Sequence, residues 1–331
     1  MMMLFFCTIV GLFLAALPNV LWLIGWVIGK MLGYCLPYRW FGWTALLLVV
    51  SFYLLMAYGY YIGRFNVEVK EMQYSHASIP KSFDGFRTVH ISDMHLSTFD
   101  DAPEELAKIV ERINALSPDL ICFTGDMVTI GKKEALPYTN VLKRLNARNG
   151  VVSVLGNHDF MIYAFRGDDE AREESIRDFA SYQTDSLGWH LLRNEHMLIH
   201  AEDGSMITIL GVDNACCKHQ GFKSINKGDL AKAIKDTDGF RILLSHDPSH
   251  WSAEVVPNSD IPLTLSGHTH SAQIRIFGWT PAKYAFTEVA GEYSSGDQTL
   301  YINVGLGCTA PFRIGVNPEI TLITLKADSK H

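Results

Sequence analysis

The stretch FRTVHISDMHLS, residues 86–97, is a short run of apolar and β-branched residues followed directly by Asp93 and His95. The same order, an apolar run and then polar side chains, recurs four more times along the chain. The recurrences are FTGDMV (123–128), LGNHDF (155–160), LLSHDPSH (243–250) and LSGHTHSAQ (265–273). Loops that follow parallel strands converge on one edge of a sheet, which is where α/β folds hold their sites. The five stretches therefore predict an α/β domain with one shared site.

The rest of the chain from residue 67 alternates between predicted strands and amphipathic helices. Strands buried on both faces are predicted at 86–92, 120–124, 151–155, 206–212, 240–245, 261–266, 300–304 and 320–325. A first helix is predicted around Leu106 and Ile113, with Asp101 as its N-cap and Glu104 three residues on. Further helices are predicted at 133–146, 169–186 and 227–234. This order favours two packed sheets flanked by helices in a single domain, residues 67–331.

The polar residues after the strands are of the types that bind divalent metal ions. They are Asp93, His95, Asp126, Asn157, His158, Asp159, His246, His268 and His270. Carboxylate, amide and imidazole ligands suit Mn, Fe, Zn or Co, and no thiolate is offered. Asp93 and His95 stand two positions apart, so an extended segment turns both side chains to the same face. The pattern predicts a site for two metal ions.

The first 66 residues differ from the rest and predict a membrane anchor. They contain three cations and no acidic residue, and two uncharged apolar stretches, about 3–29 and 40–63, are each long enough to cross a bilayer. Aromatic residues gather near the ends of the second stretch, as in an interfacial belt. A cleaved signal peptide is the alternative for the first stretch, but it lacks a basic n-region. Two spans place both termini on one side of the membrane.

Charge and cysteine usage exclude several other classes of protein. Residues 67–331 carry 25 Lys and Arg against 35 Asp and Glu. Such an acidic domain lacks the basic surface that binds nucleic acid, so no nucleic-acid partner is expected. Six cysteines in 331 residues are no disulfide framework. Adjacent Cys216 and Cys217 are interpreted as reduced thiols, with a strained vicinal bridge as the alternative.

In its five motifs the chain resembles the calcineurin-like metallophosphoesterase superfamily. The order D-x-H, G-D, G-N-H-D, a lone H and G-H-x-H matches over about residues 84–326. The resemblance implies a four-layer α/β/β/α sandwich, here preceded by two N-terminal transmembrane helices. The anchor and the segments LYINVGLG and RIGVNPEITLITL further resemble a membrane-associated branch, which includes enzymes that cleave the diphosphate of UDP-2,3-diacylglucosamine.

The resemblance also implies a role for each site residue. Asp93, His95 and His270 would bind one metal ion, Asn157, His246 and His268 the other, and Asp126 would bridge them. His158, held by Asp159, would lie beside the metals and donate to the leaving group or to the developing charge. Metal-activated hydroxide would attack phosphorus, with Mn the favoured ion of the pair. One departure is that Ser271, Ala272 and Gln273 stand where many relatives have two glycines before the glutamine, which predicts a narrower pocket on that side.

The expected function is hydrolysis of a phosphodiester or diphosphate by a membrane-bound enzyme. Tethering favours a lipid-linked substrate, such as UDP-2,3-diacylglucosamine, and the lipid bilayer is the expected partner. Arg275 and Arg313 are candidates to bind a substrate phosphate, with a surface salt bridge as the alternative for each. The location expected is a bacterial inner membrane, with two spans and the catalytic domain on the cytoplasmic face, although Lys and Arg flank both ends of the spans. Alternatives are a broad-specificity phosphoesterase for soluble substrates and a non-catalytic metal-binding scaffold; the sequence leaves the oligomeric state open.

Overall fold

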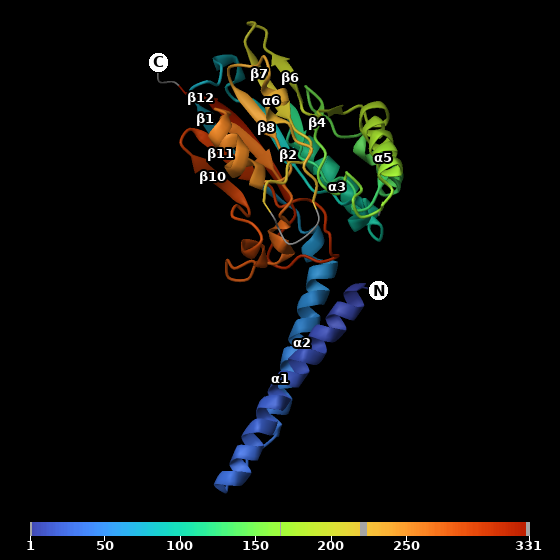
Figure 1. Ribbon diagram of the computed structural model, residues 1–331, viewed down its shortest axis with the longest axis vertical. Coiled ribbons are helices and arrows are strands. Elements are labelled where there is room, and N and C mark those ends of the chain that lie inside the picture. Colours follow the sequence, from blue (N-terminus) through green and yellow to red (C-terminus); the bar gives the residue numbers. More distant parts are fainter. Residues whose placement is uncertain (1, 166, 219–223, 329–331) are drawn as a thin grey trace.

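The computed structural model describes residues 2–165, 167–218 and 224–328. The chain forms a long helical hairpin that leads into an α/β domain (Figure 1). The hairpin consists of α1 (Met2–Leu32) and α2 (Arg39–Tyr61), which run antiparallel and pack along each other. Most of their apolar side chains are exposed, and each helix is long and apolar enough to cross a membrane. This arrangement matches the two expected spans.

The domain is built on two six-stranded sheets. The first has the order β1 (Glu68–His76), β12 (Glu319–Ala327), β2 (Arg87–Ile91), β3 (Leu120–Phe123), β4 (Val151–Ser153) and β5 (His190–Leu191). The second has the order β10 (Gly291–Ser295), β11 (Gln298–Ile302), β9 (Leu263–Ser266), β8 (Arg241–Leu244), β7 (Met206–Gly211) and β6 (Glu195–His200). Strands β2, β3, β4 and β5 are parallel, as are β7, β8, β9 and β11. The carboxyl ends of the central strands therefore lie at one edge of each sheet.

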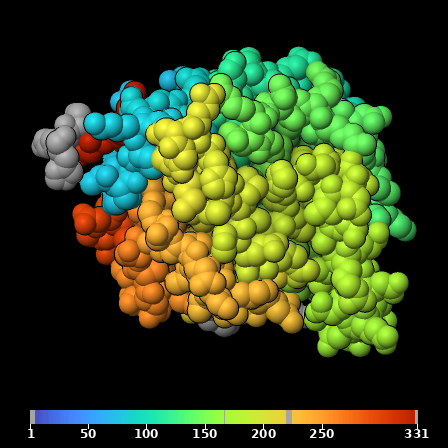
Figure 2. All heavy atoms as spheres, turned by 90° about the horizontal axis from the view of Figure 1, so that it is seen from above, coloured from blue at the N-terminus to red at the C-terminus, as the bar shows by residue number. Residues whose placement is uncertain are grey.

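Helices cover the two outer faces of these sheets. A core of apolar side chains such as Leu120, Ile209 and Leu265 fills the space between the sheets. A second core lies between the first sheet and the helices α3 (Pro103–Ala115) and α5 (Asp169–Ser181). A third core lies between the second sheet and α6 (Leu230–Ile234). The helical segment at 251–258, which ends in α7 (Val256–Asn258), packs into this third core as well. The four-layer α/β/β/α sandwich is thus confirmed. The β6–β7 hairpin and the region around residue 80 form the end of the domain opposite α1 and α2 (Figure 2).

All eight predicted strands are present. The structure has four further strands that the sequence analysis did not predict, and these are the edge strands of the two sheets. Strands β1, β5, β6 and β10 are short or expose polar side chains, so a search for segments buried on both faces does not detect them. The helix predicted at 133–146 is wrong over most of its length. That segment forms short helical turns and α4 (Thr139–Leu142), because Pro137 interrupts a longer helix.

The predicted N-cap of α3 is also wrong. The helix begins at Pro103 with Ala102 at the cap position, and Asp101 binds residues of the hairpin instead. Its Oδ2 accepts hydrogen bonds from Arg64 Nη2 at 2.5 Å and from Tyr60 Oη at 2.8 Å. A charged partner outcompetes the weaker capping interaction. Cys216 and Cys217 are free thiols, as expected.

Candidate metal centre

The five predicted motifs meet where the carboxyl edges of the two sheets face each other. Asp93 and His95 follow β2, Asp126 follows β3, and Asn157 follows β4; His246 follows β8, and His268 and His270 follow β9. All seven side chains are buried. The backbone is strained at several of them, since Asp93, His95, Asp126, His268 and His270 all have positive φ. Strain of this kind gathers at functional sites, where the fold imposes an unfavourable conformation.

Two of the preceding glycines are needed for this close approach. A Cβ atom added at Gly156 would overlap the carboxylate of Asp126, and one added at Gly267 would overlap Ser92 and the carboxylate of Asp93. Glycine at both positions therefore lets the loops approach closely enough to bring the two carboxylates into the site.

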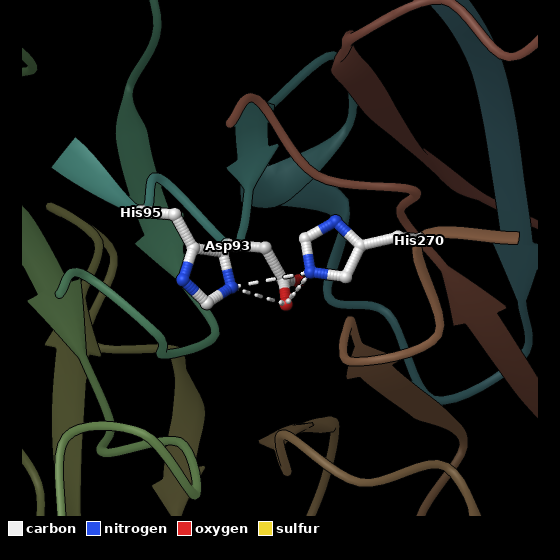
Figure 3. Close-up of side chains that lie close together, drawn as sticks. All are labelled: Asp93, His95 and His270. Carbon is white, nitrogen blue, oxygen red and sulfur yellow. Dashed lines mark hydrogen bonds and ion pairs between the residues drawn. The ribbon is translucent and has the colours of Figure 1, made fainter. Parts of the chain in front are cut away.

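Asp93, His95 and His270 form the first group of ligands (Figure 3). His270 Nε2 lies 3.1 Å from Asp93 Oδ1 and 3.2 Å from His95 Nε2, and His95 Nε2 lies 3.9 Å from the same carboxylate oxygen. In Figure 3 the two rings converge on the carboxylate of Asp93 from either side. One divalent ion could be held by these three atoms together.

Asp126, His246 and His268 form a second group beside the first. His246 Nε2 lies 3.1 Å from Asp126 Oδ2 and 3.2 Å from His268 Nδ1. The same Asp126 oxygen lies 3.7 Å from His95 Nε2 in the first group. Asp126 thus stands between the two groups, where a carboxylate can bind both ions of a pair.

The side chain of Asn157 also indicates that this site binds divalent metal ions. Both polar atoms of the buried Asn157 side chain lack a hydrogen-bond partner among the described residues. A buried amide without partners is costly, and the part of this cost that comes from the oxygen is removed if the oxygen binds a metal ion. Asn157 lines the same cavity as Asp126 and His268. The residue types are those that Mn, Fe, Zn and Co accept.

The electrostatics of the site are those of closely packed opposite charges. Burial alone would raise the pKa of Asp126, but the imidazoles of His246, His158 and His95 outweigh it and hold that pKa well below its usual value. Burial likewise opposes ionisation of His246, yet the carboxylate of Asp126 raises the pKa of His246 to about 10. Each group stabilises the charge of the other, and together they form a site that retains negative oxygen ligands at neutral pH.

His158 lies beside both groups, but Asp159 does not hold it, contrary to the sequence-based expectation. His158 Nδ1 donates to the carbonyl oxygen of Thr129 at 2.8 Å, and the ring also lies against Tyr163, with 4.7 Å between the ring centroids. Asp159 accepts backbone N–H bonds from residues 126–128 and from Gly156. The carboxylate therefore stabilises the loop that carries Asp126. Burial and the nearby Asp126 raise the pKa of Asp159 to about 8.

Three residues that orient ligands were missed by the sequence analysis. The carbonyl of Thr124 accepts from His246 Nδ1 at 2.7 Å, and Thr129 Oγ1 lies 3.1 Å from His95 Nδ1. Asp247 Oδ2 lies 3.6 Å from His268 Nε2, on the opposite side of the ring from His246. An aspartate before Pro248 is typical of an ordinary turn. Its position directly after His246 in the motif was the only available signal.

Replacing Asp247 with asparagine is expected to weaken metal binding about 10- to 100-fold, as for other outer partners of metal-bound histidines. The carboxylate orients His268 and makes the ring a better ligand, whereas an amide of the same size provides less charge. The affinity is measured by titration of the metal-free protein with Mn²⁺. The exposed Asp260, replaced with asparagine, is the matched control. Unchanged affinity in the Asp247→Asn protein would assign that residue to the turn alone.

The two arginines proposed to bind phosphate occupy different positions. Arg313 is fully buried, and its guanidinium donates to the carbonyl oxygens of Val304, Gly305 and Gly307 at 2.6–3.2 Å. These donors hold the loop after β11, and Nη2 also lies 3.4 Å from Nδ1 of His270. Contact of Arg313 with a substrate phosphate stays a prediction. Arg275 is half-buried, and its Nη2 donates to Ser271 Oγ at 3.0 Å. Its role toward a substrate stays a prediction.

A cavity of about 550 Å³ opens at the ligand groups. Asp126, Asn157, His158, His268 and His270 line it together with several alanine, proline and phenylalanine side chains and the polar residues Tyr163, Thr269, Gln273 and Thr309. Ala272 and Gln273, at the departure from the family pattern, lie on its wall in left-handed backbone conformations that favour glycine. Gln273 donates to the carbonyls of Ala310 and Phe312, so it joins two parts of this wall.

Comparison with known proteins agrees with the geometry. The sequence model described as calcineurin-like phosphoesterase matches residues 86–272. The uncharacterized metallophosphoesterase YkuE of Bacillus subtilis is 32% identical over 280 residues, which is 82% of this chain and 90% of that protein. A transmembrane protein with a metallophosphoesterase domain from Danio rerio is 28% identical and aligns over 86% of this chain and 62% of its own length. The UDP-2,3-diacylglucosamine pyrophosphatase LpxG of Chlamydia muridarum is 26% identical over 74% of this chain and 86% of that protein.

Proposed function

The chain belongs to the calcineurin-like metallophosphoesterases, and from this membership we propose that it hydrolyses a lipid-linked phosphodiester or diphosphate at a membrane. One observation carries the choice of substrate class. The cavity is lined both by the proposed metal ligands and by apolar side chains that include Ala310 and Phe312. Those two residues also pack with Met56 of α2 in one apolar cluster. A substrate with a phosphate at one end and acyl chains at the other matches this polarity.

The residues of the site would have separate roles in hydrolysis. When bound, a pair of divalent ions would neutralise phosphate oxygens and acidify a water molecule for in-line attack. Asp93, His95 and His270 on one side, and Asn157, His246 and His268 on the other, would hold the ions, with Asp126 between them. The bond from His158 Nδ1 to Thr129 leaves Nε2 as the nitrogen that can deliver a proton to the leaving oxygen.

UDP-2,3-diacylglucosamine is the specific substrate we propose, with Mn²⁺ as the preferred ion. This substrate combines a diphosphate with two acyl chains, and LpxG, named for its cleavage, is a distant relative. A nucleotide-linked substrate also supports a cytoplasmic position of the domain at a bacterial inner membrane. The hairpin would keep enzyme and substrate in the same bilayer, which raises their effective concentration.

The proposal predicts Mn²⁺-dependent release of UMP from UDP-2,3-diacylglucosamine in lipid nanodiscs, followed by mass spectrometry. The diacylated substrate should have a KM at least about 10-fold below that of its deacylated counterpart, because burial of each methylene contributes about 0.8 kcal/mol. The substitution Ala285→Glu introduces a charge into the apolar part of the cavity wall. It should remove the preference for the diacylated substrate without changing kcat for the soluble bis(p-nitrophenyl) phosphate.

Equal KM values for the two substrates would exclude recognition of the acyl chains. If the metal-loaded protein cleaves neither lipid substrates nor p-nitrophenyl esters, the catalytic proposal itself is wrong, and a metal-binding scaffold is the remaining function.

A further inference from the structure

We infer that the loop of residues 276–284, which we call the interfacial loop, inserts into the surface of the bilayer and holds the mouth of the cavity against the membrane. The inference rests on the membrane position of the hairpin in the proposed function, but not on the identity of the substrate. It follows from the depth of the loop, the exposure of its side chains and its connection to the cavity.

The depth of the interfacial loop relative to the bilayer follows from its contacts with the end of α2. Tyrosines at the end of a membrane-spanning helix mark the interface with water, and α2 ends in Tyr58, Tyr60 and Tyr61. At this level Arg313 N donates to the carbonyl of Gly59 at 3.1 Å. The next residue, Ile314, accepts from Arg275 N at 2.8 Å. The interfacial loop therefore starts at the level of the tyrosine belt, and Figure 1 places the loops before β10 beside the end of α2.

The connection between α2 and the domain is rigid. Arg64, directly after the helix, is buried and donates to the carbonyls of Tyr60 and Thr98 as well as to Asp101. A Cβ atom at Gly63 would overlap the carbonyl oxygen of Arg313, so backbone meets backbone here. Because no flexible linker intervenes, the direction of α2 in a membrane fixes which face of the domain lies on the bilayer.

The tip of the loop presents an aromatic ring in an unfavourable position for a protein in water. Ile276 and Trp279 exchange two backbone hydrogen bonds of 2.9 and 3.0 Å around Phe277 and Gly278. The two central residues have φ of 49° and 81°, as in the tight turns that prefer asparagine and glycine. Phe277 thus has a strained backbone, and its side chain is completely exposed, at 105%. Apolar surroundings would make this exposed ring favourable.

The neighbouring side chains are of the types that gather at bilayer interfaces. Trp279 and Tyr284 are 42% and 77% exposed, and Lys283 Nζ lies 5.8 and 5.4 Å from the centres of their rings. Trp and Tyr place their rings at the level of the lipid headgroups, where a lysine meets lipid phosphates. The combination indicates a lipid surface as the partner of this loop.

The interfacial loop also forms part of the cavity. Pro281 and Ala282 line its wall, and Ala285 and Phe286 follow directly. A loop inserted in the headgroup region would therefore place this wall against the bilayer. A lipid-linked phosphate could then reach the metal ligands while its acyl chains remain in apolar surroundings.

The test uses spin labels on the full-length protein in liposomes of phosphatidylethanolamine and phosphatidylglycerol. Cys35, Cys216 and Cys217 are replaced with serine, and a label is introduced by Phe277→Cys. Leu198→Cys on β6, at the opposite end of the domain, is the aqueous control, and Leu47→Cys on α2 is the membrane control. Oxygen and a water-soluble nickel chelate are the relaxation agents. At position 277 we expect the ratio of oxygen to chelate accessibility to exceed that at 198 at least about threefold.

Equal ratios at 277 and 198, with a membrane-like ratio at 47, would overturn the inference and leave the membrane anchor intact. An aqueous ratio at 47 as well would overturn the anchor, and the inference with it. The label reports depth without catalysis, so a failure of the proposed substrate does not affect the result. In a second measurement, Phe277→Ser with Trp279→Ser should raise KM for the lipid substrate about 10-fold and leave bis(p-nitrophenyl) phosphate hydrolysis unchanged.

Discussion

Replacing Asp126 with asparagine is expected to reduce metal content from two ions to one or none per chain and to lower activity to background. Asp126 lies between the two ligand groups, 3.1 Å from His246 Nε2 and 3.7 Å from His95 Nε2. An amide carries no charge to balance two divalent ions, and its nitrogen cannot bind metal. The loss of affinity should exceed the 10- to 100-fold typical of outer partners. Metal content is measured by mass spectrometry after gel filtration, and activity with a phosphodiester.

The substitution is expected to leave the fold intact, which makes the result interpretable. Asp126 has φ of 58°, a conformation that asparagine also adopts readily. The amide oxygen can still accept the 2.8 Å hydrogen bond from the backbone N–H of His158. Asp185→Asn, an exposed carboxylate on the surface, is the control. Two tightly bound ions in the Asp126→Asn protein would contradict a bridging role for this carboxylate.

The sequence predicted the site well because its residues follow buried strands. A strand such as β3 is apolar on both faces, and the polar residue after it is fixed in space by the sheet. Five such positions suffice to place Asp93, Asp126, Asn157, His246 and His268 together before any coordinates are known. The two packed sheets and the hairpin follow from the same two patterns, buried strands and long apolar helices, whereas the four-layer order came from the family resemblance.

The sequence could not predict contacts that depend on the path of loops. Asp159 is adjacent to His158, yet its carboxylate accepts N–H bonds from residues 126–128, because the loop after β3 folds over it. Arg313 was a candidate because a guanidinium group matches phosphate oxygens, and only the structure shows that its donors hold the carbonyls of residues 304–307. Thr129 contacts the site partly through its backbone carbonyl, which every residue type possesses.

The attachment of the hairpin is a further example. From the sequence, Arg64 is expected to be an exposed cation at the membrane interface, because it directly follows the second apolar stretch. In the structure it is buried and connects α2 to the loop after His95 through Thr98 and Asp101. Its partners stand 34 and 37 positions away, a separation that no local pattern reveals. The orientation of the cavity toward the membrane that we infer would depend on these contacts.

Replacing His158 with alanine should leave both metal ions bound and lower kcat for an alkyl phosphodiester about 10²- to 10⁴-fold, the range of general acid catalysis. The ring lines the cavity, and the bond from Nδ1 to Thr129 fixes its orientation. The removed group is outside both proposed sets of metal ligands. Metal content and kcat, measured on the same samples, separate this effect from that of Asp126→Asn.

The choice of leaving group tests whether His158 delivers a proton. p-Nitrophenolate departs without protonation, whereas an alkoxide requires it, so the variant should lose much less activity on a p-nitrophenyl ester than on an alkyl ester of the same phosphate. A role in positioning alone would lower both rates by the same factor. His158→Gln, which retains a polar side chain of similar reach, should behave like the alanine variant, because an amide cannot supply the proton. Wild-type rates in His158→Ala would exclude the acid, and an equal loss on both esters would assign the ring to the binding of phosphoryl charge.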